Sequence, residues 1–157
     1  MQLDPDFKQA LGFSYQLLSY RPRSIYEIRI KLEEKGYKGE LIDKVIERLK
    51  GLHYLDDKNF AKFWVEAKMK LKPVGSMILK RDLEERGIEE ALIGEAIKDK
   101  ETDYDEFKTA YDVAEAKLAT YGKIHKLKAM KRIYDYLVRR GFKFDIIRQV
   151  LDELFKK

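Results

Sequence analysis

The sequence contains no cysteine, which excludes disulfide bonds, thiolate metal sites and a cysteine nucleophile. The opening stretch MQLDPDFKQA is acidic and lacks the apolar region of a signal peptide. No run approaches the roughly 18 apolar residues that a membrane span needs. These absences predict a soluble protein of the reducing cytoplasm.

Helix-breaking residues are also scarce, with three prolines and nine glycines in 157 residues, while charged residues make up 39% of the chain. This composition favours helices joined by short turns. No stretch shows the sustained alternation of apolar and polar residues that predicts strands. Eight phenylalanines and ten tyrosines supply apolar surface for a core, so the sequence predicts an all-α folded protein.

Three similar helix ends recur along the chain: LEEKGY at 32–37, LEERGI at 83–88 and LVRRGF at 137–142. Apolar residues repeat at matching offsets on both sides of the three glycines, at positions that share one helical face. A large apolar residue follows each glycine, as expected where glycine at C′ ends a helix and a second helix begins soon after. The pattern indicates one unit repeated three times.

A further helix precedes each of these helix pairs, and each of the three begins with acidic residues that favour a helix N-terminus. They are expected at 4–20, 56–71 and 103–121. The count gives nine helices, and the predicted fold is an elongated array of three tandem three-helix repeats. The expected repeats are 1–51, 52–100 and 101–157.

Several residues are assigned local structural roles. Ser24 and Glu27 form a capping-box pattern, and Pro73 suits the first turn of a helix. His53 and His125 stand alone, which favours turn or helix-start residues over metal ligands. Trp64 is expected in packing rather than in base stacking.

No catalytic constellation is present. Neither GxGxxG nor GxxxxGK[ST] occurs, and no serine lies in a nucleophile elbow. Asp56 and Asp57 begin a helix, so capping is a simpler interpretation than metal binding. The sequence therefore predicts a binding protein without enzymatic activity, cofactor or metal.

Charge is arranged in blocks although the formal net charge is only +5. Residues 62–81 hold six basic residues against one acidic residue, and residues 82–106 hold eleven acidic residues against three basic ones. Residues 117–148 hold ten basic residues against two acidic ones. Alternating blocks suit a partner with both kinds of surface, such as a nucleoprotein, better than bare DNA.

The last basic block lies largely on an expected helix over 123–140. At 100° per residue, Lys128, Arg132 and Arg139 fall in a narrow strip interrupted by Asp135. The apolar residues of this helix fill the half opposite this strip: Ile124, Leu127, Met130, Ile133, Tyr134, Leu137 and Val138. The strip suits phosphates or an acidic protein groove, and a solvated helix face is the alternative.

The segment RPRSIYEIRIKLEEKGY, followed by IDKVIERLKGLHYLDDKNFAKFWVEAK, covers residues 21–67 and resembles the RecX family of recombination regulators. LKPVGSMILKRDLEERGI at 71–88 is similar to the family's next segment, and beyond about residue 98 only the apolar pattern and YLVRRGF persist. The resemblance implies three tandem three-helix repeats. It also implies a protein that lies along the groove of the RecA recombinase filament on DNA and lowers its ATPase and strand-exchange activities.

The resemblance implies RecA as partner, together with single- or double-stranded DNA within or beside the filament, and we expect the chain to be a monomer. One departure is local: the family often has basic residues just after the equivalent of Gly75, where this chain has Ser76 and Met77. Lys80 and Arg81 follow a turn later as substitutes. The alternatives are a helical protein that binds DNA or RNA directly and a protein–protein scaffold. The basic residues expected to contact the partner or nucleic acid are Lys68, Lys70, Lys72, Lys80, Arg81, Lys123, Lys126, Lys128, Lys131, Arg132, Arg139 and Arg140.

Overall fold

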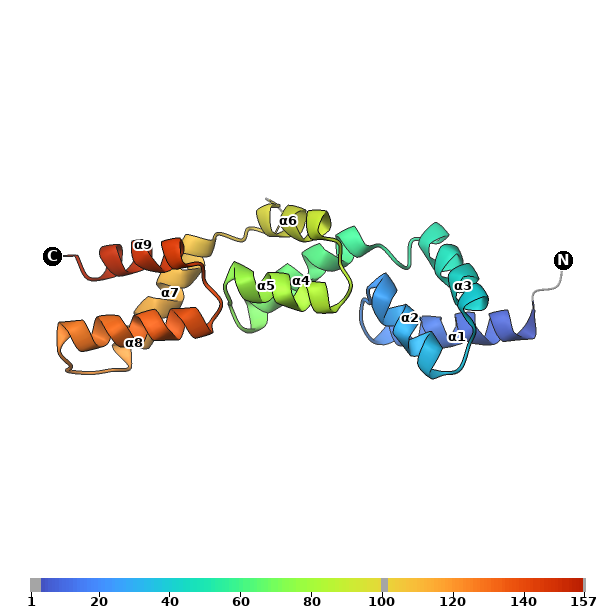
Figure 1. The fold of residues 1–157 in the computed structure, drawn as a ribbon, viewed down its shortest axis with the longest axis horizontal. Helices are drawn as coiled ribbons and strands as arrows, with labels where there is room; N and C mark the ends of the chain where they lie inside the picture. The colour runs from blue at the N-terminus through green and yellow to red at the C-terminus, as the bar shows by residue number, and fades with distance from the viewer. Residues whose placement is uncertain (1–3, 100–101, 157) are drawn as a thin grey trace.

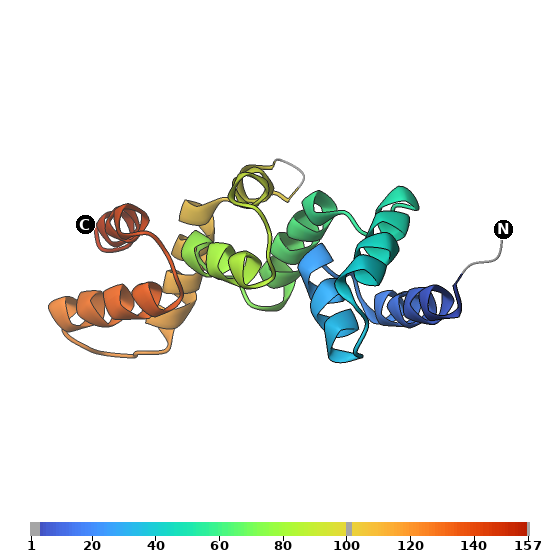
Figure 2. The same cartoon turned by 45° about the vertical axis from the view of Figure 1, so that its right-hand side comes forward.

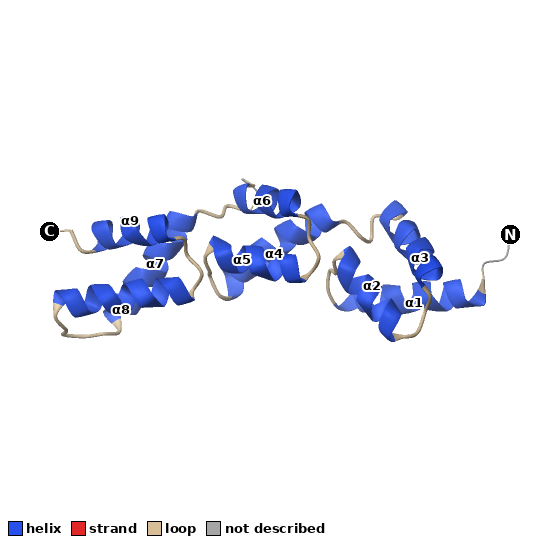
Figure 3. Cartoon of the chain, in the orientation of Figure 1, coloured by secondary structure: helices blue, strands red, loops and turns tan. Residues whose placement is uncertain are grey.

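The computed structural model describes residues 4–99 and 102–156, and this part of the chain forms nine α-helices and no strand (Figures 1 and 3). The helices are α1 (Pro5–Tyr20), α2 (Ile25–Glu34), α3 (Gly39–Gly51), α4 (Asp57–Leu71), α5 (Ser76–Glu85), α6 (Glu90–Lys98), α7 (Glu106–Ala119), α8 (Lys126–Arg139) and α9 (Phe144–Leu154). The all-α prediction is confirmed. Every helix in the described ranges is too short or too polar to cross a membrane.

The helices pack in three consecutive groups, which we call the first unit (α1–α3), the second unit (α4–α6) and the third unit (α7–α9). Each unit has its own cluster of buried apolar residues. Figure 1 shows the units one after another in an elongated array with the two termini at opposite ends, and Figure 2 shows the same order from another side. The predicted array is therefore confirmed, while the limits 1–51, 52–100 and 101–157 stay a prediction.

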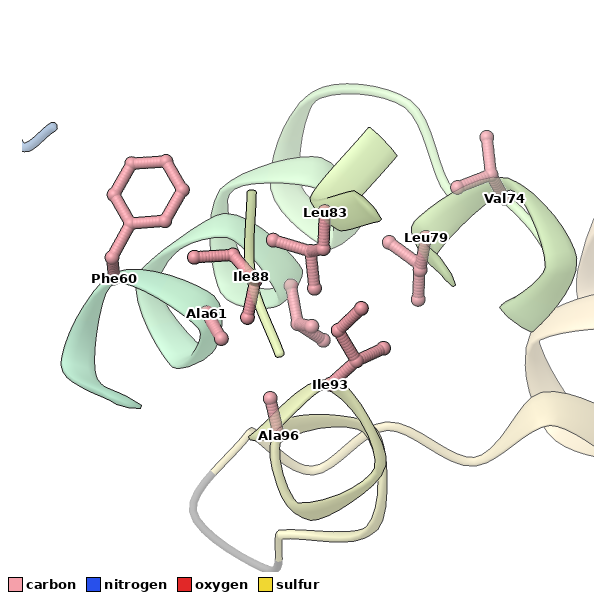
Figure 4. Packing of buried hydrophobic residues seen from close by; sticks show 9 residues of the cluster. Phe60, Ala61, Val74, Leu79, Leu83, Ile88, Ile93 and Ala96 are labelled. Atoms are coloured by element: carbon pink, nitrogen blue, oxygen red, sulfur yellow. The ribbon is translucent and has the colours of Figure 1, made fainter. Parts of the chain in front are cut away.

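Each core lies where its three helices meet. In the second unit, Leu79 and Leu83 from α5 converge with Ile93 from α6 and with Phe60 and Ala61 from α4 (Figure 4). All five side chains are at most 2% exposed. Burial of such side chains stabilises a fold by about 1.5–3 kcal/mol each for the larger ones, so each unit holds its own helices together.

The middle helix of each unit ends in the same way. In the first unit, the Gly36 N–H donates to the Glu33 carbonyl at 2.9 Å, and the Tyr37 N–H donates to the Leu32 carbonyl at 3.2 Å. The same two hydrogen bonds recur at the ends of α5 and α8, and the glycine has a positive φ in all three. This is the Schellman arrangement, in which a left-handed glycine lets the last carbonyls find donors. The predicted helix ends are confirmed.

The first and second units are joined through the start of α2. The Asp57 carboxylate at the first position of α4 accepts a hydrogen bond from the Ile25 N–H at 2.9 Å. The Ser24 hydroxyl donates to the Arg86 carbonyl at 2.7 Å, while Ser24 and Glu27 complete the predicted capping box. We call this contact region the first junction.

The second junction uses equivalent positions to join the second and third units. The Glu106 carboxylate at the first position of α7 accepts from the Ser76 N–H at 3.1 Å. The Gly75 N–H donates to the Arg140 carbonyl at 2.8 Å. Each later unit therefore supplies the carboxylate that caps the middle helix of the unit before it.

Two local predictions need correction. Asp56 caps its own helix by accepting from the Lys58 N–H, but Asp57 caps α2 of the preceding unit instead of α4. Pro73 lies outside α5, which begins at Ser76, because Gly75 takes the N-cap position.

The apolar half of α8 is only partly buried. Leu127, Tyr134 and Val138 are 68%, 40% and 39% exposed. The reason is that α8 packs against α7 and α9 through a narrower face, whose centre carries the buried Ile133 and Leu137.

Candidate partner-binding surface

The predicted basic residues fall into two separate regions. Lys68 and Lys70 lie in the last turn of α4, Lys72 follows as its C-cap, and Lys80 and Arg81 lie on α5. The remaining seven belong to the third unit, on α8 or in the residues that flank it. The structure thus separates the two basic blocks into different units.

In the second unit, most of these charges are matched by carboxylates. Lys68 Nζ lies 3.4 Å from the buried Asp82 carboxylate, and Arg81 lies 3.4 Å from the other oxygen of that carboxylate. Arg81 also faces Glu85 at 3.9 Å, and Lys80 faces Glu84 at the same distance. Ion pairs within the unit reduce the field that Lys68, Lys80 and Arg81 present to a partner. Lys70 and Lys72 are exposed.

In the third unit, most of the predicted basic residues are exposed. Lys126, Lys128, Arg132 and Arg139 are exposed, and none of the four pairs with a carboxylate of the described residues. Lys131 forms an ion pair with Asp135 at 3.3 Å, one turn along the helix. The predicted strip on α8 is thus present on the surface, and Asp135 interrupts it as expected.

Aromatic rings hold two of these arginines in place. The Arg132 guanidinium lies 5.5 Å from the ring centroid of Tyr121, and the Arg139 guanidinium lies 5.9 Å from that of Tyr136. Such cation–π contacts restrict the side chain without neutralising its charge. Lys123, in the loop before α8, is exposed as well.

Arg140 takes part in the contact between the second and third units. Its guanidinium donates to the Tyr136 hydroxyl at 2.6 Å and to the Pro73 carbonyl across the second junction. Its carbonyl accepts from Gly75. Arg140 therefore takes part in the connection between units, and its contact with a partner stays a prediction.

Sequence reasoning missed Lys98 and Lys143, which the fold brings near Lys80 and Arg81. These four basic residues line a groove of about 510 Å³ between α5 and α6, with Lys143 contributed by the third unit. The apolar side chains in its lining include Met77, Ile93 and Ile97. The repeat pattern held no signal for this grouping, because it depends on how the third unit sits against the second.

The remaining polar residues have structural roles. His125 Nδ1 accepts from the Leu127 N–H at the start of α8, and His53 has a positive φ of 64° in a turn, so both interpretations are confirmed. Trp64 packs on Phe60, and the Arg86 guanidinium carbon lies 3.8 Å from the centroid of the Trp64 ring. These contacts confirm a packing role for Trp64.

One tyrosine adds a contact near the second junction. Burial, with the nearby Glu106 and Asp105 carboxylates, raises the pKa of Tyr104 well above its usual value. Its hydroxyl therefore stays protonated and donates to the Val74 carbonyl at 2.9 Å. Within residues 4–99 and 102–156, no group of three or more histidine or acidic side chains is placed to hold a metal ion.

The fold and this surface define an all-α protein made of tandem three-helix units, with an open basic face on the third unit. Models of the RecX first, second and third three-helix domains match residues 10–49, 56–97 and 103–151 respectively. Together these matches cover most of the chain, so the chain belongs to the RecX family.

Two individual relatives match over almost their whole lengths. The chain is 34% identical to a protein named Regulatory protein RecX from Prosthecochloris aestuarii, over 96% of this chain and 97% of the relative. It is 35% identical to one of the same name from Chlorobium phaeobacteroides, over 98% of both. The crystal structure of RecX from Lactobacillus salivarius is similar in fold, with a TM-score of 0.85, 24% identity and coverage of 97% of this chain and 98% of that one.

Proposed function

We propose that this protein binds the RecA recombinase filament on DNA and lowers the ATPase and strand-exchange activities of that filament. The observation that carries the proposal is that all three units match the RecX three-helix domains in order, in a family whose curated members are named regulatory proteins. No enzymatic step is assigned to the chain, so regulation acts through binding.

The shape of the molecule supports a filament as the partner. The units follow one another in an elongated array, and each presents its own exposed surface along the length of the chain (Figure 1). A filament repeats the same surface at regular intervals, so several units can engage it at once. Linked contacts add by effective concentration even when each is weak, which makes an extended array efficient on a repeating partner.

The charge distribution supports the same partner. The third unit offers open basic residues on α8, while three of the five predicted basic residues of the second unit are paired with carboxylates. A protein that bound bare DNA along its length would gain from open basic residues in every unit, because phosphate neutralisation drives such binding. A filament contains both protein and DNA, so it can meet both kinds of surface.

The test is the ATPase activity of RecA on single-stranded DNA with increasing amounts of the full chain, together with binding of the chain to the same DNA without RecA at the same salt concentration. We expect ATPase activity to fall at protein concentrations where binding to DNA alone is weak. Unchanged ATPase activity alongside tight, salt-sensitive binding to DNA alone would overturn the proposal in favour of a DNA-binding protein. Strand exchange measured under the same conditions tests the second activity.

A further inference from the structure

The middle helix of the third unit is longer than its counterparts. α8 has 14 residues, whereas α2 and α5 have 10 each, although all three end just before the same glycine position. The additional turn therefore lies at the N-terminal end of α8. It begins at Lys126 and includes Leu127, whose side chain is 68% exposed.

Exposed apolar side chains follow this turn along one line of the helix. Tyr134 and Val138 are 40% and 39% exposed. At 100° per residue, Leu127, Tyr134 and Val138 lie within about 40° of one another, so they form one stripe along α8. We call these three residues the α8 stripe.

The stripe is peculiar to the third unit. Seven residues before the helix-ending glycine, α8 has Tyr134 where the other middle helices have a basic residue, and three residues before it α8 has Val138 where they have a glutamate. The charged counterparts are Arg29 and Glu33 in α2, and Lys80 and Glu84 in α5. These positions are thus solvent-facing in the repeat, and only α8 places apolar side chains there. Repeat structure alone does not require them, which points to a partner that covers them.

Basic residues lie beside the stripe. Lys131 is next to it on the helical wheel, and Lys128, Arg139 and Arg132 lie further round on the same side. All four are exposed, and only Lys131 pairs with a carboxylate of the described chain. The complementary partner surface has apolar side chains along one line and carboxylates to one side of it. DNA phosphates would satisfy the basic residues but would leave Leu127 and Val138 in water.

We propose that the exposed face of α8 is the docking site for an acidic amphipathic protein segment. Its apolar side chains pack on the α8 stripe, and its carboxylates meet Lys128, Arg132 and Arg139. The inference rests on the proposed function, because it assigns this segment to the RecA subunits of the filament rather than to the filament's DNA. It makes that function more specific, because α8 binds the protein part of the filament and not its DNA. Burial of apolar surface then supplies part of the binding free energy.

The test replaces the aliphatic part of the stripe in the full chain, with Leu127→Ser and Val138→Ser combined. Both residues are exposed, so the fold is retained, and circular dichroism verifies this. The matched control combines Leu52→Ser and Leu71→Ser, which removes two exposed leucines from the first and second units. Binding is measured to RecA filaments on single-stranded DNA and to the same DNA without RecA, and the association state of the chain is measured by sedimentation.

We expect the stripe variant to bind filaments about tenfold or more weakly, with DNA binding and association state unchanged, because two aliphatic contacts are lost. The control variant should bind filaments like the original chain. Equal loss of filament and DNA binding would make DNA the occupant, and a change only in self-association would make a second copy the occupant; both overturn the inference. So does unchanged filament binding by the stripe variant, and in that case inhibition by the original chain still upholds the proposed function. If the original chain neither binds nor inhibits filaments, the proposed function fails as well.

Discussion

The Glu106 carboxylate accepts hydrogen bonds from both the backbone N–H and the hydroxyl of Ser76, which lies thirty residues earlier in the chain. The N–H contact is 3.1 Å, and the shortest hydroxyl contact is 2.8 Å. The same carboxylate accepts from the Lys143 N–H at 3.3 Å. One side chain at the start of α7 thus connects the starts of α5 and α9, and the second junction depends on it.

Replacement of Glu106 by alanine should lower the free energy of unfolding. The change leaves the N–H groups of Ser76 and Lys143 without their acceptor, and such a loss costs about 1–3 kcal/mol. Urea denaturation measures it. Glu115→Ala is the matched control, because Glu115 is an exposed glutamate on the same helix. Equal stability of the two variants would show that the Glu106 contacts add nothing to the fold.

Two helix-ending glycines should respond differently to alanine. Gly141 and Gly36 have φ of 81° and 91°, so alanine at either is strained by about 1–2 kcal/mol. A Cβ at Gly141 would also lie 2.4 Å from Ile78 Cγ1 of the second unit, whereas a Cβ at Gly36 meets no atom within 4 Å. Gly141→Ala should therefore destabilise the protein more than Gly36→Ala in thermal unfolding. Both glycine changes are then repeated with Ile78→Ala, which removes the two atoms nearest to the added Cβ. The difference in stability between the two variants should then narrow, and a difference of the same size would place its cause elsewhere.

The first junction should weaken in acid because of Glu27. Burial raises the pKa of Glu27, but hydrogen bonds from Arg21 and from the Ser24 N–H, with the Arg21 and Arg86 charges, outweigh burial and hold it below its usual 4.5. A lowered folded-state pKa gives stability that is present above the unfolded value and lost as the pH falls through the folded value. Unfolding free energies measured from pH 6 to pH 3 should therefore decrease, and Glu27→Gln should flatten that decrease.

Asp57 gives the opposite dependence and serves as the control. Burial is the main cause that raises its pKa above the usual 3.8, so the folded state binds this proton more readily than the unfolded chain does. Protonation of Asp57 as the pH falls therefore stabilises the folded state. It offsets part of the unfolding free energy that is lost at Glu27. Asp57→Asn keeps an oxygen acceptor for the Ile25 N–H and should make the acid decrease steeper. A shallower decrease of the unfolding free energy in this variant would contradict a raised pKa of Asp57.

The open basic residues of α8 should contribute to filament binding. Lys128, Arg132 and Arg139 changed together to alanine should weaken binding by about tenfold or more and reduce its dependence on salt, while circular dichroism stays the same. The matched control changes Lys8, Lys44 and Lys58, which are exposed lysines of the first and second units, and removes the same charge. Equal loss in the two triple variants would show a general effect of net charge and would return the α8 strip to a solvated face.

The repeat architecture could be predicted from the sequence because it depends on local chemistry. Glycine ends each middle helix through its own backbone, and the apolar positions recur on one helical face, so LEEKGY, LEERGI and LVRRGF marked the units correctly. The N-cap role of His125 and the capping box at Ser24 were equally local. The basic strip on α8 followed from helical periodicity alone.

The junctions could not be predicted in this way. Asp57 caps α2, and Arg140 donates to the Pro73 carbonyl. Both contacts depend on where one unit packs against the next. The exposure of Leu127, Tyr134 and Val138 was missed for a related reason. A helical wheel shows which residues share a side, but the width of the covered side depends on which helices pack there.

The chemistry that links the units is unevenly distributed along the array. The first position of α1 is Pro5, which has no carboxylate to offer, while α4 and α7 have Asp57 and Glu106 there. At the other end, the extra turn of α8 occupies the place where α2 and α5 begin and where their first N–H group donates to such a carboxylate. The second unit alone holds both halves of the link. The middle of the array is therefore held on both sides by a shared carboxylate, whereas each outer unit is held on one side.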